Sequence, residues 1–113
     1  MKKIYICGKV TGDLYYREKF RKEENRLFSL GYYPINPAAL VSSRAEWAIA
    51  MKTVLRTMLL CDGVSLLPDW KKSRGAKIEA RLARELGIDV RKNTGWNEPA
   101  GTPQSRPRDE RYW

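Results

Sequence analysis

The sequence contains no histidine among its 113 residues, and it has only two cysteines. Histidine is a common metal ligand and the usual general base of enzymes, so its absence argues against histidine-dependent catalytic triads and against a zinc site. Cys7 and Cys61 each lie within an apolar run and lack the close spacing of paired metal ligands. We therefore expect neither a metal nor another cofactor.

Long hydrophobic runs are absent as well. No apolar stretch approaches the roughly 20 residues that a helix needs to cross a bilayer, and the N-terminus lacks the apolar segment of a signal peptide. The sequence therefore predicts a reduced, cytoplasmic protein that does not enter a membrane.

Acidic residues are few in comparison with basic ones: 13 Asp and Glu stand against 22 Lys and Arg, which gives a net charge of +9. Such an excess favours an anionic partner, for example a nucleotide phosphate, a nucleic-acid backbone or an acidic protein. Nucleic acid ranks last, because the basic residues are spread over all the expected helices and do not alternate with aromatic residues. The length allows one domain with a modest core.

Short apolar runs alternate with segments of helical periodicity. The expected strands cover residues 3–7, 32–36, 63–68 and 88–90. The expected helices cover residues 15–30, 47–59 and 73–86. This alternation predicts an α/β fold, a small Rossmann-like or flavodoxin-like three-layer sandwich with a mainly parallel sheet of four or five strands.

The composition changes after residue 92, which divides the chain into an α/β domain over residues 1–92 and a basic tail over residues 93–113. The tail is rich in Pro and Gly and ends in an aromatic pair. Two interpretations remain open: a flexible tail, or an arm that docks on a partner subunit.

The segment GKVTG follows the first expected strand. In an open parallel sheet, ligands bind beyond the carboxyl ends of the strands. Gly8 and Gly12 would let a ligand approach the backbone, while Lys9 adds a positive charge and Thr11 a hydroxyl. The alternative is that a glycine serves only to make the turn.

The stretch PDWKKSRGAKIEARLA lies after the third expected strand. Ser73 occupies an N-cap position, and Gly75 leaves the first helical turn open for close approach of a ligand. Glu79 falls on the helix face of small and apolar side chains, so it should point inward. Because a buried carboxylate costs several kcal/mol unless it is paired or functional, Glu79 is either salt-bridged or part of a site.

The order of strands and loops assigns three further polar residues to one edge of the sheet or the other. Asn36 and Asp69 follow strands and belong to the ligand-binding edge, whereas Asp62 precedes a strand and belongs to the opposite edge. We therefore include Asn36 and Asp69 among the candidate substrate-binding residues and treat Asp62 as a loop or capping residue.

The segments YICGKVTG and SRGAKIE resemble two motifs of the nucleoside 2-deoxyribosyltransferase superfamily, Tyr-x-Cys/Ser-Gly-x-x-x-Gly and Ser/Asp-x-Gly-x-x-x-Glu. The segments INPA, CDGVSLLPDW and SRGAKIEARLA are similar to a small, often phage-encoded family of unknown function within that superfamily. The resemblance covers residues 1 to 90 and implies a phage or bacterial source.

This resemblance implies a chemistry. Glu79 matches the nucleophile that attacks the anomeric carbon, Tyr5 matches the tyrosine that orients it, and Ser73 matches a position that in monophosphate-specific members is serine. The loop expected to contact phosphate and sugar comprises Gly8, Lys9, Val10, Thr11 and Gly12. The implied activity is that of an N-glycosidase or deoxyribosyltransferase acting on a 2′-deoxynucleoside, as its 5′-monophosphate, through a covalent glycosyl-Glu79 intermediate.

One feature departs from the superfamily pattern. Its members place an aspartate in the second helix to hold the sugar or base, but the corresponding segment here reads AMKTVLRTM, and only Glu46 and Asp69 are available as substitutes. The alternative function is therefore a non-catalytic module that senses or sequesters a nucleotide. The resemblance also implies a homo-oligomer, a dimer or larger.

Overall fold

A parallel sheet forms the centre of the protein, whose computed structural model describes residues 1–101. The strands are β1 (Lys3–Cys7), β2 (Tyr33–Ile35), β3 (Gly63–Leu66) and β4 (Asp89–Lys92). They pair in the order β2-β1-β3-β4, and every pairing is parallel. The expected α/β class and parallel sheet are confirmed, with four strands in the described part of the chain.

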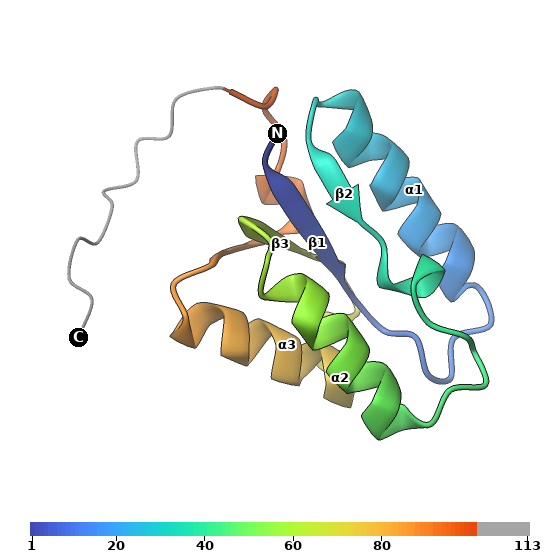
Figure 1. The fold of residues 1–113 in the computed structure, drawn as a ribbon. Helices are drawn as coiled ribbons and strands as arrows, with labels where there is room; N and C mark the ends of the chain where they lie inside the picture. Colours follow the sequence, from blue (N-terminus) through green and yellow to red (C-terminus); the bar gives the residue numbers. More distant parts are fainter. Residues whose placement is uncertain (102–113) are drawn as a thin grey trace.

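Helices cover both faces of this sheet and complete a three-layer arrangement (Figure 1). They are α1 (Tyr16–Ser29), α2 (Trp47–Met58) and α3 (Arg74–Glu85). Side chains alternate along β1, so Ile4 and Ile6 pack with α1 on one face, while Tyr5 and Cys7 pack with α2 and α3 on the other. The central strand therefore supplies both halves of the core.

The helix ends follow the signals in the sequence. Ser73 caps α3, its Oγ accepting a hydrogen bond from the amide of Ala76 at 3.1 Å. Gly31 and Gly87 follow the ends of α1 and α3 with φ angles of +91° and +74°, which only glycine adopts readily. Within residues 1–101, no helix is long and apolar enough to span a bilayer.

The segment after β4 packs against the domain. Trp96 is 2% exposed, its Nε1 donates to the Val64 carbonyl at 3.0 Å, and its ring meets that of Tyr32 edge-on at 5.7 Å. A Cβ on Gly63 would lie 2.6 Å from the Trp96 ring, so this glycine makes room for the indole.

The packed structure thus continues past the boundary expected after residue 92. The polar composition around Trp96 gave no sign that this one aromatic side chain would fill a space over Gly63. Residues 102–113 of the expected tail, which include its aromatic end, lie outside the described residues.

Candidate functional site

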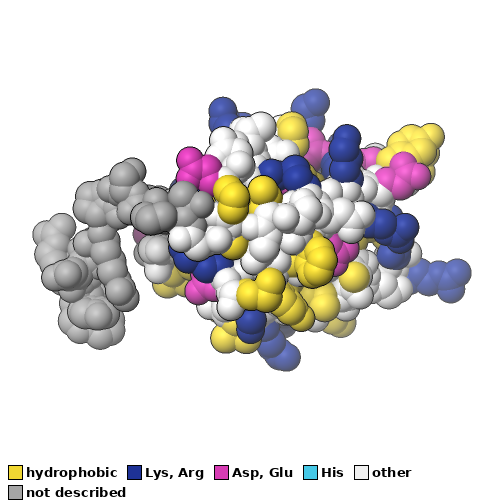
Figure 2. Space-filling view, turned by 90° about the horizontal axis from the view of Figure 1, so that it is seen from above, with side chains coloured by type: hydrophobic (Ala, Val, Ile, Leu, Met, Phe, Trp, Pro, Cys, Tyr) yellow, Lys and Arg dark blue, Asp and Glu magenta, His cyan; other side chains and the backbone are white. Residues whose placement is uncertain are grey.

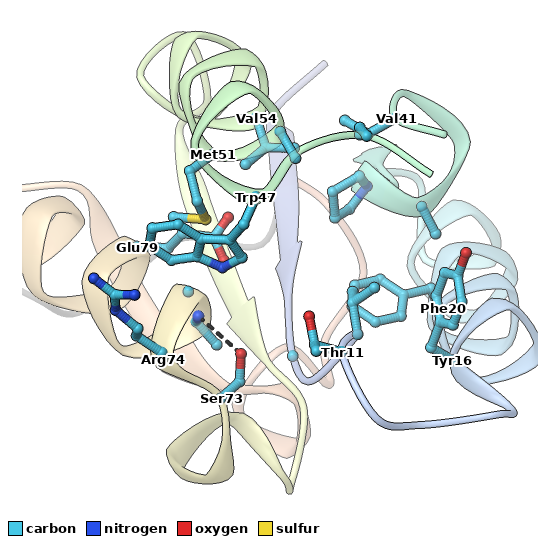
Figure 3. A pocket seen from close by; sticks show the side chains of 18 of the residues that line it. Thr11, Tyr16, Phe20, Val41, Trp47, Met51, Val54, Ser73, Arg74 and Glu79 are labelled. Carbon is cyan, nitrogen blue, oxygen red and sulfur yellow. Dashed lines mark hydrogen bonds between the residues drawn. The ribbon is translucent and has the colours of Figure 1, made fainter. Parts of the chain in front are cut away.

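A cavity of about 660 Å³ opens at the carboxyl edge of the sheet, between the loop after β1, the start of α2 and the start of α3 (Figure 3). This is the edge where parallel α/β folds bind ligands, and the volume is in the usual range for small-molecule sites. Of the expected site residues, the lining includes Tyr5, Gly8, Val10, Thr11, Ser73, Gly75 and Glu79. Residues 74 positions apart in the sequence are thereby brought together.

Glu79 reaches the cavity from α3 and is only 5% exposed. The Tyr5 hydroxyl donates a short hydrogen bond to its Oε2, and the Cys7 Sγ lies 3.7 Å from its Oε1. Within residues 1–101, no Lys or Arg forms an ion pair with this carboxylate. The salt-bridge alternative considered for Glu79 is therefore not what the described structure contains.

Burial determines how these groups titrate. It raises the pKa of Glu79 to about 7, although the hydrogen bonds from Tyr5 and Cys7 act in the opposite direction. Burial, followed by the neighbouring Glu79 charge, holds the pKa of Tyr5 and that of Cys7 well above their ordinary values. At neutral pH the phenol is a hydrogen-bond donor, while the carboxyl group exists in both its neutral and charged forms.

The loop after β1 needs its two glycines for different reasons. A Cβ on Gly8 would lie 2.7 Å from the Leu67 side chain, so a larger residue would collide with the core. Gly12 has a φ of +82°, in a turn where the Asp13 amide donates to the Val10 carbonyl at 3.2 Å. Both glycines therefore shape the loop that presents its backbone and Thr11 to the cavity.

Lys19, on α1, holds this loop in place. Its Nζ donates to the Lys9 carbonyl at 2.7 Å and pairs with Asp13 and Asp69, each at 2.5 Å. Asp69 also accepts a hydrogen bond from the Lys9 amide at 3.1 Å. Sequence reasoning missed Lys19, because nothing in the charge pattern of a helix marks the one lysine that reaches back to a loop.

Four expected substrate-binding residues lie outside the cavity lining, namely Lys9, Gly12, Asn36 and Asp69. Asp69 fastens the loop as described above. Asn36 caps a short 3₁₀ turn by accepting from the Ala38 amide at 2.9 Å, and its amide nitrogen donates to Glu24. In this structure both side chains organise the loops around the cavity.

The start of α3 supplies positive charge to the rim. The Arg74 guanidinium lies 4.2 Å from the centre of the Trp47 ring, and Lys72 lines the cavity beside it. Among the described residues, neither cation has an ion-pair partner. The absence of a side chain at Gly75 lets α2 pack closely here, because a Cβ at this position would lie 2.9 Å from the Met51 sulfur.

The wall that α2 contributes is apolar. Ala50, Met51 and Val54 line the cavity on this side, while Glu46 is exposed and outside the lining. The helical periodicity predicted this helix, but not which of its apolar residues would face a cavity. Glu79 is thus the one acidic residue in the lining, as far as residues 1–101 are concerned.

On the face of the molecule seen in Figure 2, the basic side chains do not gather in one patch. Figure 2 shows Lys and Arg scattered around the visible face, separated by acidic and apolar side chains. This face therefore does not provide the continuous basic stripe that tracks a nucleic-acid backbone.

The fold and cavity define a small Rossmann-like α/β protein with a buried carboxyl group at the carboxyl edge of its sheet. Residues 2–92 match the family described as "Domain of unknown function (DUF4406)", and the chain belongs to this family. A comparison with curated proteins finds no match. The family description names no activity.

Proposed function

We propose that this protein cleaves the N-glycosidic bond of a 2′-deoxynucleoside 5′-monophosphate, with Glu79 as the nucleophile. The observation that carries the proposal is a buried carboxylate that faces a cavity, is held by a tyrosine and lacks a cationic partner among the described residues. A carboxylate placed in this way is available to react, whereas a salt-bridged one is not. The resemblance of its motifs to the nucleoside 2-deoxyribosyltransferase superfamily supports the same assignment.

The reaction proceeds in two displacements. The Glu79 carboxylate attacks the anomeric carbon, the bond from that carbon to the base nitrogen breaks, and the base leaves with the electron pair and takes a proton from water. Water then attacks the same carbon and releases Glu79, or a second base does so, which distinguishes hydrolysis from transfer. Tyr5 orients the carboxylate through its hydrogen bond.

The charge at the rim favours a phosphorylated substrate. Lys72 and Arg74 flank Ser73 at the N-terminal end of α3, where the helix dipole also attracts anions. Ser73 adds a hydroxyl at the same place. These groups support the 5′-monophosphate over the free nucleoside.

The apolar wall of α2 favours a second candidate function, a non-catalytic module that binds a nucleotide. Because α2 contains no Asp or Glu, no carboxylate of this helix can accept hydrogen bonds from the sugar hydroxyls. For such a module, a nucleotide would raise the melting temperature and be recovered chemically unchanged. The expected homo-oligomer likewise remains a prediction.

The test is mass spectrometry of the protein after incubation with 2′-deoxynucleosides and their 5′-monophosphates, with and without a second free base. We expect wild type to release or exchange the base, the monophosphates to react faster, and Glu79→Gln to lose activity by at least about a thousandfold. The matched control is Glu85→Gln, an exposed residue of the same helix, which should react like wild type. Base release that persists in Glu79→Gln would remove this residue as the nucleophile.

A further inference from the structure

The cavity has two chemically different sides (Figure 3). Ser73 and Arg74 lie on one side at the start of α3, and Tyr16, Phe20 and Val41 lie across from them. The first side is cationic and rich in hydrogen-bond donors. The second contains mainly carbon.

The composition of the second side is unusual for a nucleotide site. Among the described lining residues away from the start of α3 and from Glu79, none carries a carboxylate, a carboxamide or a charge. The polar side-chain atoms of these residues are the hydroxyls of Tyr5, Thr11, Tyr16, Ser42 and Ser43 and the indole nitrogen of Trp47. The apolar wall, as we call the apolar part of this lining, extends from α1 across to α2, where Met51 adjoins Gly75, and consists of Phe20, Pro37, Ala38, Val41, Ala45, Ala50, Met51 and Val54.

The geometry of displacement decides which part of the substrate meets this wall. A nucleophile attacks the anomeric carbon from the side opposite the leaving group, so the base lies beyond that carbon as seen from Glu79. The phosphate takes the cationic rim at Arg74, which leaves the side across the cavity for the base. A phosphate or a sugar hydroxyl against the apolar wall would lose its hydration without a replacement partner.

We propose that the apolar wall selects bases by shape and apolar contact, so that the substrates are 2′-deoxynucleotides whose base carries an apolar substituent such as a methyl group. This inference rests on the proposed function and adds the substrate class to it. Reading the polar edge of a base requires paired donors and acceptors, and the wall offers few. An added methyl group, in contrast, is buried against the side chains of residues such as Val41 and Val54.

The strength of selection follows from the same chemistry. A site built to hydrogen-bond one group rejects analogues that lack it by about 10⁴-fold or more, whereas an apolar pocket distinguishes one methyl group by about 10-fold to 200-fold. We therefore expect kcat/KM for dTMP to exceed that for dUMP by about tenfold. The kcat/KM for N6-methyl-dAMP should exceed that for dAMP by a similar factor, because the wall contacts the added methyl group whichever base carries it.

The experiment compares these two pairs in wild type and in two variants that place a hydroxyl on the wall at nearly constant size, Val54→Thr and Val41→Thr. The matched control is Ile49→Thr, on the same helix as Val54 but 58% exposed and outside the cavity. Each wall variant should reduce the preference for the methylated member at least about threefold, while the control keeps it. Val41 lies in a loop and is only half-buried, so its variant keeps the test open if Val54→Thr fails to fold.

The outcomes separate this inference from the proposed function. Base release at equal rates from the methylated and unmethylated members would overturn the inference and leave the nucleophile assignment standing. If no base is released from any substrate, the proposed function fails, and the inference is judged by the dissociation constants of dTMP and dUMP. Tighter binding of dTMP that is lost in Val41→Thr would support it, and equal or weaker binding of dTMP would overturn it.

Discussion

Glu23 and Glu79 are both buried glutamates, 4% and 5% exposed, and they lie on opposite faces of the same sheet. Arg26 binds both oxygens of Glu23 at 2.7 Å, and the Ser65 hydroxyl donates to it at 2.6 Å. Glu79 has only Tyr5 and Cys7 as described partners, neither of them a cation. The two carboxylates are thus almost equally buried but lie in different chemical environments.

The difference separates a structural carboxylate from a reactive one. The bidentate partner of Glu23 also donates to the carbonyls of Asn93 and Trp96, so the pair ties α1 to the segment that covers the sheet. Glu79 faces a cavity, and burial raises its pKa to about 7. A glutamate that is buried, uncompensated and beside open space costs stability, which is typical of functional sites.

Removing the charge of Glu23 should have the largest effect on the free energy of unfolding. Glu23→Gln leaves Arg26 without its bidentate partner, so the free energy of unfolding at pH 7 should fall by about 3 kcal/mol. Urea unfolding followed by circular dichroism measures this. A Glu23→Gln protein as stable as wild type would mean that the Arg26 pair does not anchor the segment around Trp96.

The same substitution at Glu79 should have the opposite effect and stabilise the protein in alkaline solution. The folded-state pKa is raised from 4.5 to about 7, so the folded protein binds more protons than the unfolded chain between these values. The contribution of Glu79 to stability is thus present below pH 4.5 and is lost as the pH rises to about 7. Since Gln does not ionise, the stability of Glu79→Gln relative to wild type should be about 2 kcal/mol greater at pH 8 than at pH 5.

The same urea titrations at pH 5 and pH 8 provide the measurement, with Glu85→Gln as the exposed control. A difference between Glu79→Gln and wild type that does not change with pH would contradict the raised pKa of Glu79.

The hydrogen bond from Tyr5 is one of the features that distinguish Glu79 from Glu23. This bond lowers the pKa of the carboxyl group, so Tyr5→Phe should raise that pKa further. The rising limb of kcat/KM against pH would then move to higher pH, with Phe filling the same buried space. Tyr33→Phe, at an exposed tyrosine of β2, is the control, and an unchanged profile in Tyr5→Phe would show that the phenol does not tune the nucleophile.

Much of the fold follows from local pattern. The Ile and Tyr run predicts β1 with the observed bounds Lys3–Cys7, and the spacing of small residues in α3 predicts that Glu79 points inward. The parallel order follows from the alternation of strands and helices. These features depend on neighbours in the sequence, and so the sequence reveals them.

Features that depend on contacts between distant residues were harder to predict. The pairing of Tyr5 with Glu79 came from the motif resemblance and not from periodicity, because the two are 74 positions apart. Asp69 lies on the expected edge, yet its oxygens hold Lys19 and the Lys9 amide. Strand topology can assign a residue to an edge, but it cannot say whether its side chain faces the ligand or a neighbouring loop.

The central claim is that Glu79 forms a covalent bond to the sugar. The most direct test is rapid quenching of wild type with excess dTMP, followed by protease digestion and mass spectrometry of the peptide that contains Glu79. We predict a peptide heavier by one 2-deoxyribosyl 5-phosphate unit, with the added mass on Glu79. Release of thymine at every quench time with this peptide unmodified, or with the sugar on another residue, would contradict the account.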